Sequence, residues 1–211
     1  NAMKPIRIPG NYNYIAVFLT FACNLKCGYC INNFEQKSIR RKVISGKDFV
    51  LGLNRIISRE DLPVTIQGGE PTLHPDFYYI VNNLKPELNI DILTNLRFDV
   101  DEFIKKVDPA RVKRDSPYAS IRISYHPEQM KLDDLMRDTL KLRDAKFSVG
   151  IWGVLHPASE KAVLAAMERC KKLGIDFRTK EFLGKHDGRL HGTYRYPGAC
   201  DGKFRKKVKC R

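Results

Sequence analysis

Three cysteines stand within eight residues in the segment CNLKCGYC, as Cys23, Cys27 and Cys30. Thiolates are common protein ligands of zinc and of iron–sulfur clusters. A structural zinc site and a closed cubane cluster each use four protein ligands, whereas this segment supplies three. Three thiolates that converge from one loop predict a [4Fe–4S] cluster with one iron left open. An open metal position is typical of a reactive site, because a small molecule can bind there.

Strands and helices alternate along the chain around this loop. Expected strands are runs of β-branched and aromatic residues, and expected helices repeat apolar residues at helical spacing. The expected strands are residues 14–20, 63–67, 89–94, 119–125, 147–155 and 175–183. The expected helices are residues 46–59 with Ser45 as N-cap, 75–84, 100–107, 132–145 and 157–173 with Gly174 as C-cap. This alternation predicts a parallel sheet with crossover helices.

The number of strand–helix units sets the expected architecture. Six units are fewer than the eight of a complete barrel. We therefore predict an α/β fold, an open partial (β/α)6 barrel of parallel strands, with a doubly wound sheet as the alternative. We expect residues 4–183 to form this barrel and residues 1–3 to be an expression scar. Residues 184–211 are expected to be an irregular basic C-terminal segment, with the start of a truncated auxiliary-cluster region as one interpretation.

Polar side chains on two expected strands indicate what the barrel encloses. Arg122, Ser124 and His126 share one face of the strand at 119–125. Arg178 and Lys180 share one face of the last strand. A complete barrel fills its lumen with branched apolar side chains, so polar faces predict a lumen that holds a polar ligand. For the last strand, an exposed sheet edge is the alternative.

The cysteine pattern resembles that of a known family. Cys23-x3-Cys27-x2-Cys30, with Tyr29 before the last cysteine and the segment GGEP at residues 68–71, resembles the radical S-adenosylmethionine (radical SAM) enzymes. The resemblance covers residues 14–183. It implies that a reduced [4Fe–4S] cluster cleaves SAM to a 5′-deoxyadenosyl radical. That radical would abstract hydrogen from an unidentified peptide or small-molecule substrate, and a one-electron donor such as flavodoxin or ferredoxin would supply the electron.

The resemblance also implies roles for individual residues. The expected cluster ligands are Cys23, Cys27 and Cys30. The expected SAM contacts are Tyr29, Gly68, Gly69, Glu70, Pro71, Thr94, Asn95, Ser124 and Ile151. The expected catalytic or substrate contacts are His126, Arg178 and Lys180. Two roles stay open for Glu70, which would either hold the amine of SAM or lock its own loop.

The remaining cysteines have different expected environments. Cys170 shares a helix face with apolar residues and is expected in the core. Cys200 and Cys210 lie in polar sequence near the C-terminus. They resemble the first ligands of a second, auxiliary cluster, and unpaired thiols or a weak zinc site are the alternative.

The charge and hydropathy of the chain limit which other functions are possible. The net charge is +14, and part of it lies in the terminal GKFRKKVKCR. A solvated basic surface is favoured over a nucleic-acid contact, because aromatic residues are not interleaved with the charges. No apolar run is long enough for a membrane span or signal peptide, so we expect a cytoplasmic protein. The competing functions are a glycyl-radical-enzyme activase and a zinc-stabilised basic nucleic-acid-binding module.

Overall fold

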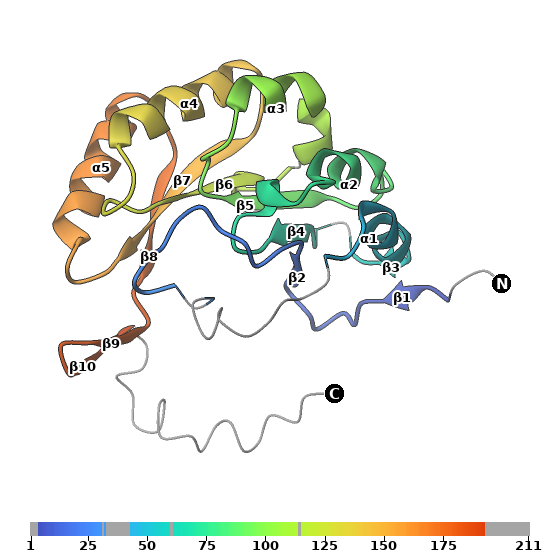
Figure 1. The fold of residues 1–211 in the computed structure, drawn as a ribbon, viewed down its shortest axis with the longest axis horizontal. Coiled ribbons are helices and arrows are strands. Elements are labelled where there is room, and N and C mark those ends of the chain that lie inside the picture. The colour runs from blue at the N-terminus through green and yellow to red at the C-terminus, as the bar shows by residue number, and fades with distance from the viewer. Residues whose placement is uncertain (1–3, 31, 33–42, 60, 114, 193–211) are drawn as a thin grey trace.

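A computed structural model describes residues 4–30, 32, 43–59, 61–113 and 115–192 (Figure 1). Its main sheet has six strands in the order β2-β4-β5-β6-β7-β8, and every neighbouring pair is parallel. The strands are β2 (Ile15–Phe18), β4 (Val64–Gln67), β5 (Ile90–Thr94), β6 (Ile121–Tyr125), β7 (Val149–Leu155) and β8 (Phe177–Glu181). This topology confirms the predicted open partial barrel of parallel strands.

Helices cover one face of this sheet (Figure 1). They are α1 (Gly46–Leu53), α2 (Phe77–Asn83), α3 (Val100–Lys106), α4 (Leu132–Asp144) and α5 (Glu160–Lys172). Two 3₁₀ turns, η2 (Pro71–Leu73) and η3 (Pro109–Val112), lie in the connections. Among the described residues, no helix is long and apolar enough to cross a bilayer.

The core lies between the sheet and these helices. Ile66, Ile92, Ile121, Ile123 and Ile151, on four neighbouring strands, are each at most 1% exposed. Successive side chains of a strand point to opposite faces, so the residues between them lie on the inner face of the barrel. Arg122 and Ser124 alternate with the buried isoleucines of β6, as predicted, and are half-buried.

The first helix is shorter than expected. Ser45 caps it through a hydrogen bond from the backbone N–H of Asp48, as predicted, but α1 ends at Leu53 rather than at residue 59. Beyond it, β3 (Ile56–Ile57) pairs in parallel with β1 (Ile6–Arg7). The apolar pair 56–57 fits helical spacing and a strand equally well, and pairing with the N-terminal segment selects the strand.

A hairpin replaces part of the expected irregular C-terminal segment. β9 (Gly184–His186) and β10 (Arg189–His191) pair antiparallel. Asp187 and Gly188 connect them with φ angles of 45° and 75°. Asp-Gly at two adjacent positive-φ positions is typical of a tight hairpin turn. Residues 193–211 lie outside the described part of the chain.

Candidate active site

The cysteine loop follows β2 at the carboxyl edge of the sheet. Cys23 is exposed, Cys30 is half-buried and Cys27 is only 6% exposed. Burial, and secondly the negative charge on Glu128, Cys30 and Cys23, raises the pKa of Cys27 to about 12. Cys23 and Cys30 thus lie near enough to Cys27 to affect its ionisation. A bound metal cation offsets both effects, since a coordinating thiol is deprotonated by the metal charge. The donor set therefore suits a thiolate-bound cluster.

The GGEP segment continues the pairing of β2 and β4 past the strand ends. The N–H of Gly69 donates to the carbonyl of Thr20 at 2.9 Å, and the N–H of Glu70 donates to that of Ala22 at 2.8 Å. A Cβ on Gly68 would overlap the carbonyl oxygen of Thr20, and a Cβ on Gly69 that of Ala22. Both glycines are thus required for close approach to the cysteine loop, and the two motifs lie side by side.

Glu70 is fully buried beneath this junction. Its Oε1 accepts hydrogen bonds from the N–H and Oγ1 of Thr72, at 3.2 and 2.7 Å, and from Oγ1 of Thr94 at 2.8 Å. Its Oε2 accepts from the N–H of Asn95 at 2.7 Å. Burial raises the pKa of Glu70, and these hydrogen bonds oppose that rise. The contacts match the loop-locking role. Pro71, buried at the start of η2, follows directly.

The residues after β5 connect the same junction to the cysteine loop. Nδ2 of Asn95 donates to Oδ1 of Asn24 at 2.7 Å and lies 3.8 Å from Sγ of Cys23. Nδ2 of Asn24 donates to the carbonyl of Arg97 at 2.9 Å, and the N–H of Arg97 donates to Oδ1 of Asn95 at 2.9 Å. Thr94 and Asn95, predicted as SAM contacts, hold neighbouring protein loops in this structure.

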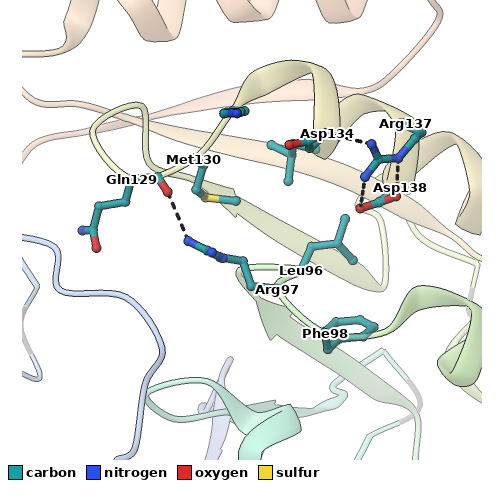
Figure 2. Close-up of a pocket in the computed structure, with 10 residues that line it drawn as sticks. Leu96, Arg97, Phe98, Gln129, Met130, Asp134, Arg137 and Asp138 are labelled. Carbon is teal, nitrogen blue, oxygen red and sulfur yellow. Dashed lines mark hydrogen bonds and ion pairs between the residues drawn. The ribbon is translucent and has the colours of Figure 1, made fainter.

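The start of the segment after β6 also contacts the cysteine loop. Oε1 of Gln129 accepts from the N–H of Lys26 at 2.6 Å, and its carbonyl accepts from Arg97 at 3.3 Å. Beside this contact lies a pocket of about 560 Å³, whose wall includes Phe98 and Met130 (Figure 2). Neither Asn24 nor Gln129 was predicted from the sequence, because a single amide residue in a loop carries no periodic signal.

Tyr29 links the cysteine loop to the ends of β6, β7 and β8. Its hydroxyl is 2.8 Å from Nδ1 of His126, and its ring stacks on His156 with centroids 5.0 Å apart. The ring of Phe182 packs edge-on against the rings of Tyr29 and His156. The ring centroids of His186 and His156 are 4.6 Å apart. Burial lowers the pKa of His126 and of His156, which favours the neutral imidazoles. His126 thus shares a site with Tyr29, whereas His156 and His186 were missed by sequence reasoning.

The two predicted ligand contacts on β6 and β7 face opposite ways. Ser124 lies on the inner face, where it pairs with Trp152. Ile151 is fully buried in the core on the helix-covered face. Its neighbour on that face, Gly153, abuts Val163 of α5. Strand alternation turns the side chain of Trp152 rather than that of Ile151 inward, and the predicted SAM contact of Ile151 stays a prediction.

Arg178 and Lys180 on β8 have different environments. Nε of Arg178 forms an ion pair with Asp176 at 3.0 Å. Its guanidinium lies over the rings of Tyr118 and Trp152, at 4.8 and 5.8 Å. Within the described part of the chain, Lys180 makes no such ion pair. Arg178 is therefore engaged in the protein, whereas Lys180 is exposed.

An open parallel barrel with a three-thiol loop at its carboxyl edge defines a class of protein that holds a metal cluster there. The family model of the radical SAM superfamily matches residues 17–186. The chain belongs to the radical SAM superfamily.

Two curated relatives share the name GTP 3′,8-cyclase. The GTP 3′,8-cyclase of Aliarcobacter butzleri is 26% identical over 180 residues, covering 81% of this chain and 55% of the relative. The GTP 3′,8-cyclase of Nautilia profundicola is 25% identical over 184 residues, covering 81% of this chain and 56% of the relative. The chain thus spans little more than half the length of these relatives.

Solved structures share the fold. SuiB of Streptococcus suis bound to S-adenosylmethionine has a TM-score of 0.57 at 19% identity, covering 92% of this chain and 44% of SuiB. The structure described as native anSMEcpe with bound AdoMet and Kp18Cys peptide has a TM-score of 0.59 at 15% identity, covering 84% and 55%. At this identity, the likeness concerns the fold alone.

Proposed function

We propose that Cys23, Cys27 and Cys30 hold a [4Fe–4S] cluster and that SAM binds the open iron. When bound and reduced, the cluster supplies one electron that cleaves SAM to methionine and a 5′-deoxyadenosyl radical. The single observation that carries this proposal is the backbone pairing of Gly69 with Thr20 and of Glu70 with Ala22. That pairing holds the GGEP segment next to the cysteine loop. There the segment could contact the methionine part of a SAM molecule bound to the open iron.

The residues of the chain position and shield this site. Glu70 fixes the loops after β4 and β5, and Asn95 fixes the cysteine loop through Asn24. The carbonyl of Gly68 accepts a hydrogen bond from Nδ2 of Asn32 at 3.1 Å. A carbonyl so placed can also accept from an ammonium group, since it has two lone pairs. Tyr29 and its histidine neighbours close the side of the loop nearest β6 and β7.

The substrate we propose is a small molecule, and GTP is the first candidate. The curated relatives named GTP 3′,8-cyclase support this choice. A peptide substrate is the alternative, supported only by a structural neighbour solved with a peptide. A flavodoxin- or ferredoxin-type protein is the proposed electron donor. A second cluster at Cys200 and Cys210 stays a prediction, because both lie outside the described residues.

One observation favours a competing metal. Ligand atoms of Cys27, His126 and Glu128 all lie within 4.8 Å of one another. A cysteine, a histidine and a carboxylate are a ligand set that suits zinc. Cys27 would be a ligand in both sites, so the two metals compete for its thiolate. Metal analysis of the purified protein distinguishes the two.

The test is anaerobic reconstitution with iron and sulfide, followed by dithionite and SAM. Chromatography then measures 5′-deoxyadenosine. We expect product from the wild type and from Cys170→Ala, whose thiol lies in the core, and none from Cys27→Ala. A protein that forms a cluster but no 5′-deoxyadenosine contradicts the proposed reaction. A protein that retains zinc and assembles no cluster favours the competing site.

A further inference from the structure

The side-chain amide of Asn95 reaches the sulfur of Cys23, an expected cluster ligand. An asparagine amide nitrogen carries two N–H donors. Nδ2 of Asn95 donates to Oδ1 of Asn24 at 2.7 Å and to Sγ of Cys23 at 3.8 Å, a longer distance that suits the larger sulfur atom. The same sulfur accepts a hydrogen bond from the backbone N–H of Leu25 at 3.4 Å. Two N–H groups, one of them from the loop after β5, are thus directed at one thiol.

The contacts around Asn95 fix which way its amide faces. Oδ1 of Asn95 accepts from the backbone N–H of Arg97 at 2.9 Å, so the oxygen faces a donor. Nδ2 of Asn24 donates to the carbonyl of Arg97 at 2.9 Å, which leaves Oδ1 of Asn24 as the acceptor beside Asn95. A reversed amide would set Nδ2 of Asn95 against the N–H of Arg97, and Oδ1 against the oxygen of Asn24. The amide of Asn95 therefore presents its N–H groups, and not its oxygen, to Cys23.

The backbone around Asn95 is held as firmly as its side chain. Asn95 is only 5% exposed, and its N–H donates to the buried carboxylate of Glu70 at 2.7 Å. The next residue, Leu96, is buried and has a φ of 59°, a left-handed conformation that residues with a Cβ seldom adopt. Its N–H donates to Oγ1 of Thr94 at 3.0 Å. Backbone strain of this kind persists where the surroundings impose it, and it is common at functional sites.

We propose that Asn95 is a positioning residue that raises the reduction potential of the cluster through the thiolate of Cys23. Hydrogen bonds to the sulfurs are among the factors that set the potential of an iron–sulfur cluster. An N–H donor stabilises a sulfur more as its negative charge grows, so it favours the state that has gained an electron. This inference rests on the proposed function, since it requires a cluster at Cys23. The SAM contact expected for Asn95 would act on SAM affinity instead, so measurements with and without SAM separate the two roles.

A reductive titration of the anaerobically reconstituted protein with dithionite, in the absence of SAM, tests this role. Electron paramagnetic resonance follows the reduced cluster. Asn95→Ser is the main variant: its hydroxyl can accept from the N–H of Arg97, because serine bonds to the backbone two residues on, but it is too short to reach Cys23. Asn24→Ala removes the other partner of the amide and leaves the donors of Asn95 in place. Asn82→Ala, near the end of α2, is the matched control, because it loses a side-chain hydrogen bond of 2.8 Å to a backbone carbonyl.

We expect Asn95→Ser to make the cluster roughly three- to tenfold harder to reduce, which lowers its potential by about 30–60 mV. Asn24→Ala and Asn82→Ala should match the wild type within about 1.5-fold in the same equilibrium, about 10 mV. If Asn95→Ser holds no cluster, Asn95→Asp is measured in its place, because it keeps the acceptor for Arg97 and loses both donors. Its potential should fall further, since the carboxylate also adds negative charge.

Three results overturn the inference. They are an unchanged potential in the Asn95 variant, an equal fall in Asn24→Ala, which would trace the effect to a loosened loop, and a loss of SAM affinity in Asn95→Ser at an unchanged potential. A wild type that assembles no [4Fe–4S] cluster would instead refute the proposed function, and the inference with it. Absence of 5′-deoxyadenosine from a wild type with a normal cluster would refute the proposed reaction, whereas the differences in potential would still decide the role of Asn95.

Discussion

The backbone N–H of Asn95 donates to the buried carboxylate of Glu70 at 2.7 Å, which joins the loop after β5 to the loop after β4. Asn95 in turn holds Asn24 of the cysteine loop. Three loops at the carboxyl edge of the sheet thus depend on one side chain that is inaccessible to solvent. This arrangement gives the GGEP glutamate a positioning role.

Replacement of Glu70 by glutamine should destabilise the protein. Glutamine has one acceptor oxygen, so an amide NH2 would face donors that now bond to a carboxylate. We expect the free energy of unfolding in urea to fall by about 2 kcal/mol, the usual cost of a buried unsatisfied group. Glu168→Gln, on the exposed face of α5, is the control and should be neutral. Equal stability of both variants would contradict the role assigned to Glu70.

The glycines of the GGEP segment should not tolerate a side chain. Gly68→Ala or Gly69→Ala places a Cβ against a carbonyl of the cysteine loop. We expect a loss of roughly 1–3 kcal/mol in stability, from overpacking, together with lower iron content after reconstitution. Gly52→Ala is a matched control because a Cβ there meets nothing within 4 Å in helix α1. That variant should be neutral or more stable, and an equal loss of iron in it would argue against the close approach.

The hydrogen bond between Tyr29 and His126 should be measurable by removal of one oxygen. Tyr29→Phe keeps the ring stacked on His156 and leaves Nδ1 of His126 without its partner. We expect a loss of about 1 kcal/mol in the free energy of unfolding, typical of a single hydrogen bond. Tyr79→Phe, an exposed tyrosine of α2, should show no change. Identical stability of the two variants would mean that the 2.8 Å contact contributes nothing.

Cys170 should resist alkylation while the protein is folded. It is fully buried in the core, and burial raises its pKa to about 11. Because the thiolate is the reactive form and Cys170 is inaccessible, we expect it to stay protonated and unmodified at pH 8 until the protein unfolds. Peptide mapping after iodoacetamide treatment of the metal-free protein should find Cys23 modified and Cys170 unmodified. Modification of Cys170 without denaturant would contradict its placement.

Much of the fold was predictable because its elements have strong local patterns. The buried strand β5 is rich in apolar residues, with Ile90, Ile92 and Leu93, and α4 repeats apolar residues at helical spacing. The cysteine loop and GGEP segment were found because together they resemble two motifs of the radical SAM enzymes. The β9–β10 hairpin was missed although Asp187-Gly188 is a direct turn signal.

The arrangement of the candidate site depended instead on contacts between distant parts of the chain, which the sequence pattern does not show. Gln129 meets Lys26 across 103 positions, and Tyr29 meets His126 across 97. No local pattern specifies such a pair. The inward face of β7 is a different case, since alternation from the buried Ile151 places Trp152 inside. Strand periodicity, applied to that segment, would have found it.

The central claim is that three cysteines leave one iron open for SAM, and electron paramagnetic resonance of the reduced cluster tests it most directly. Spectra of the reconstituted wild type are recorded with and without SAM. Binding at the open iron changes the surroundings of the cluster, so we predict a shift of the g values on addition of SAM. A fully formed [4Fe–4S] cluster whose spectrum is the same in both samples would contradict the account.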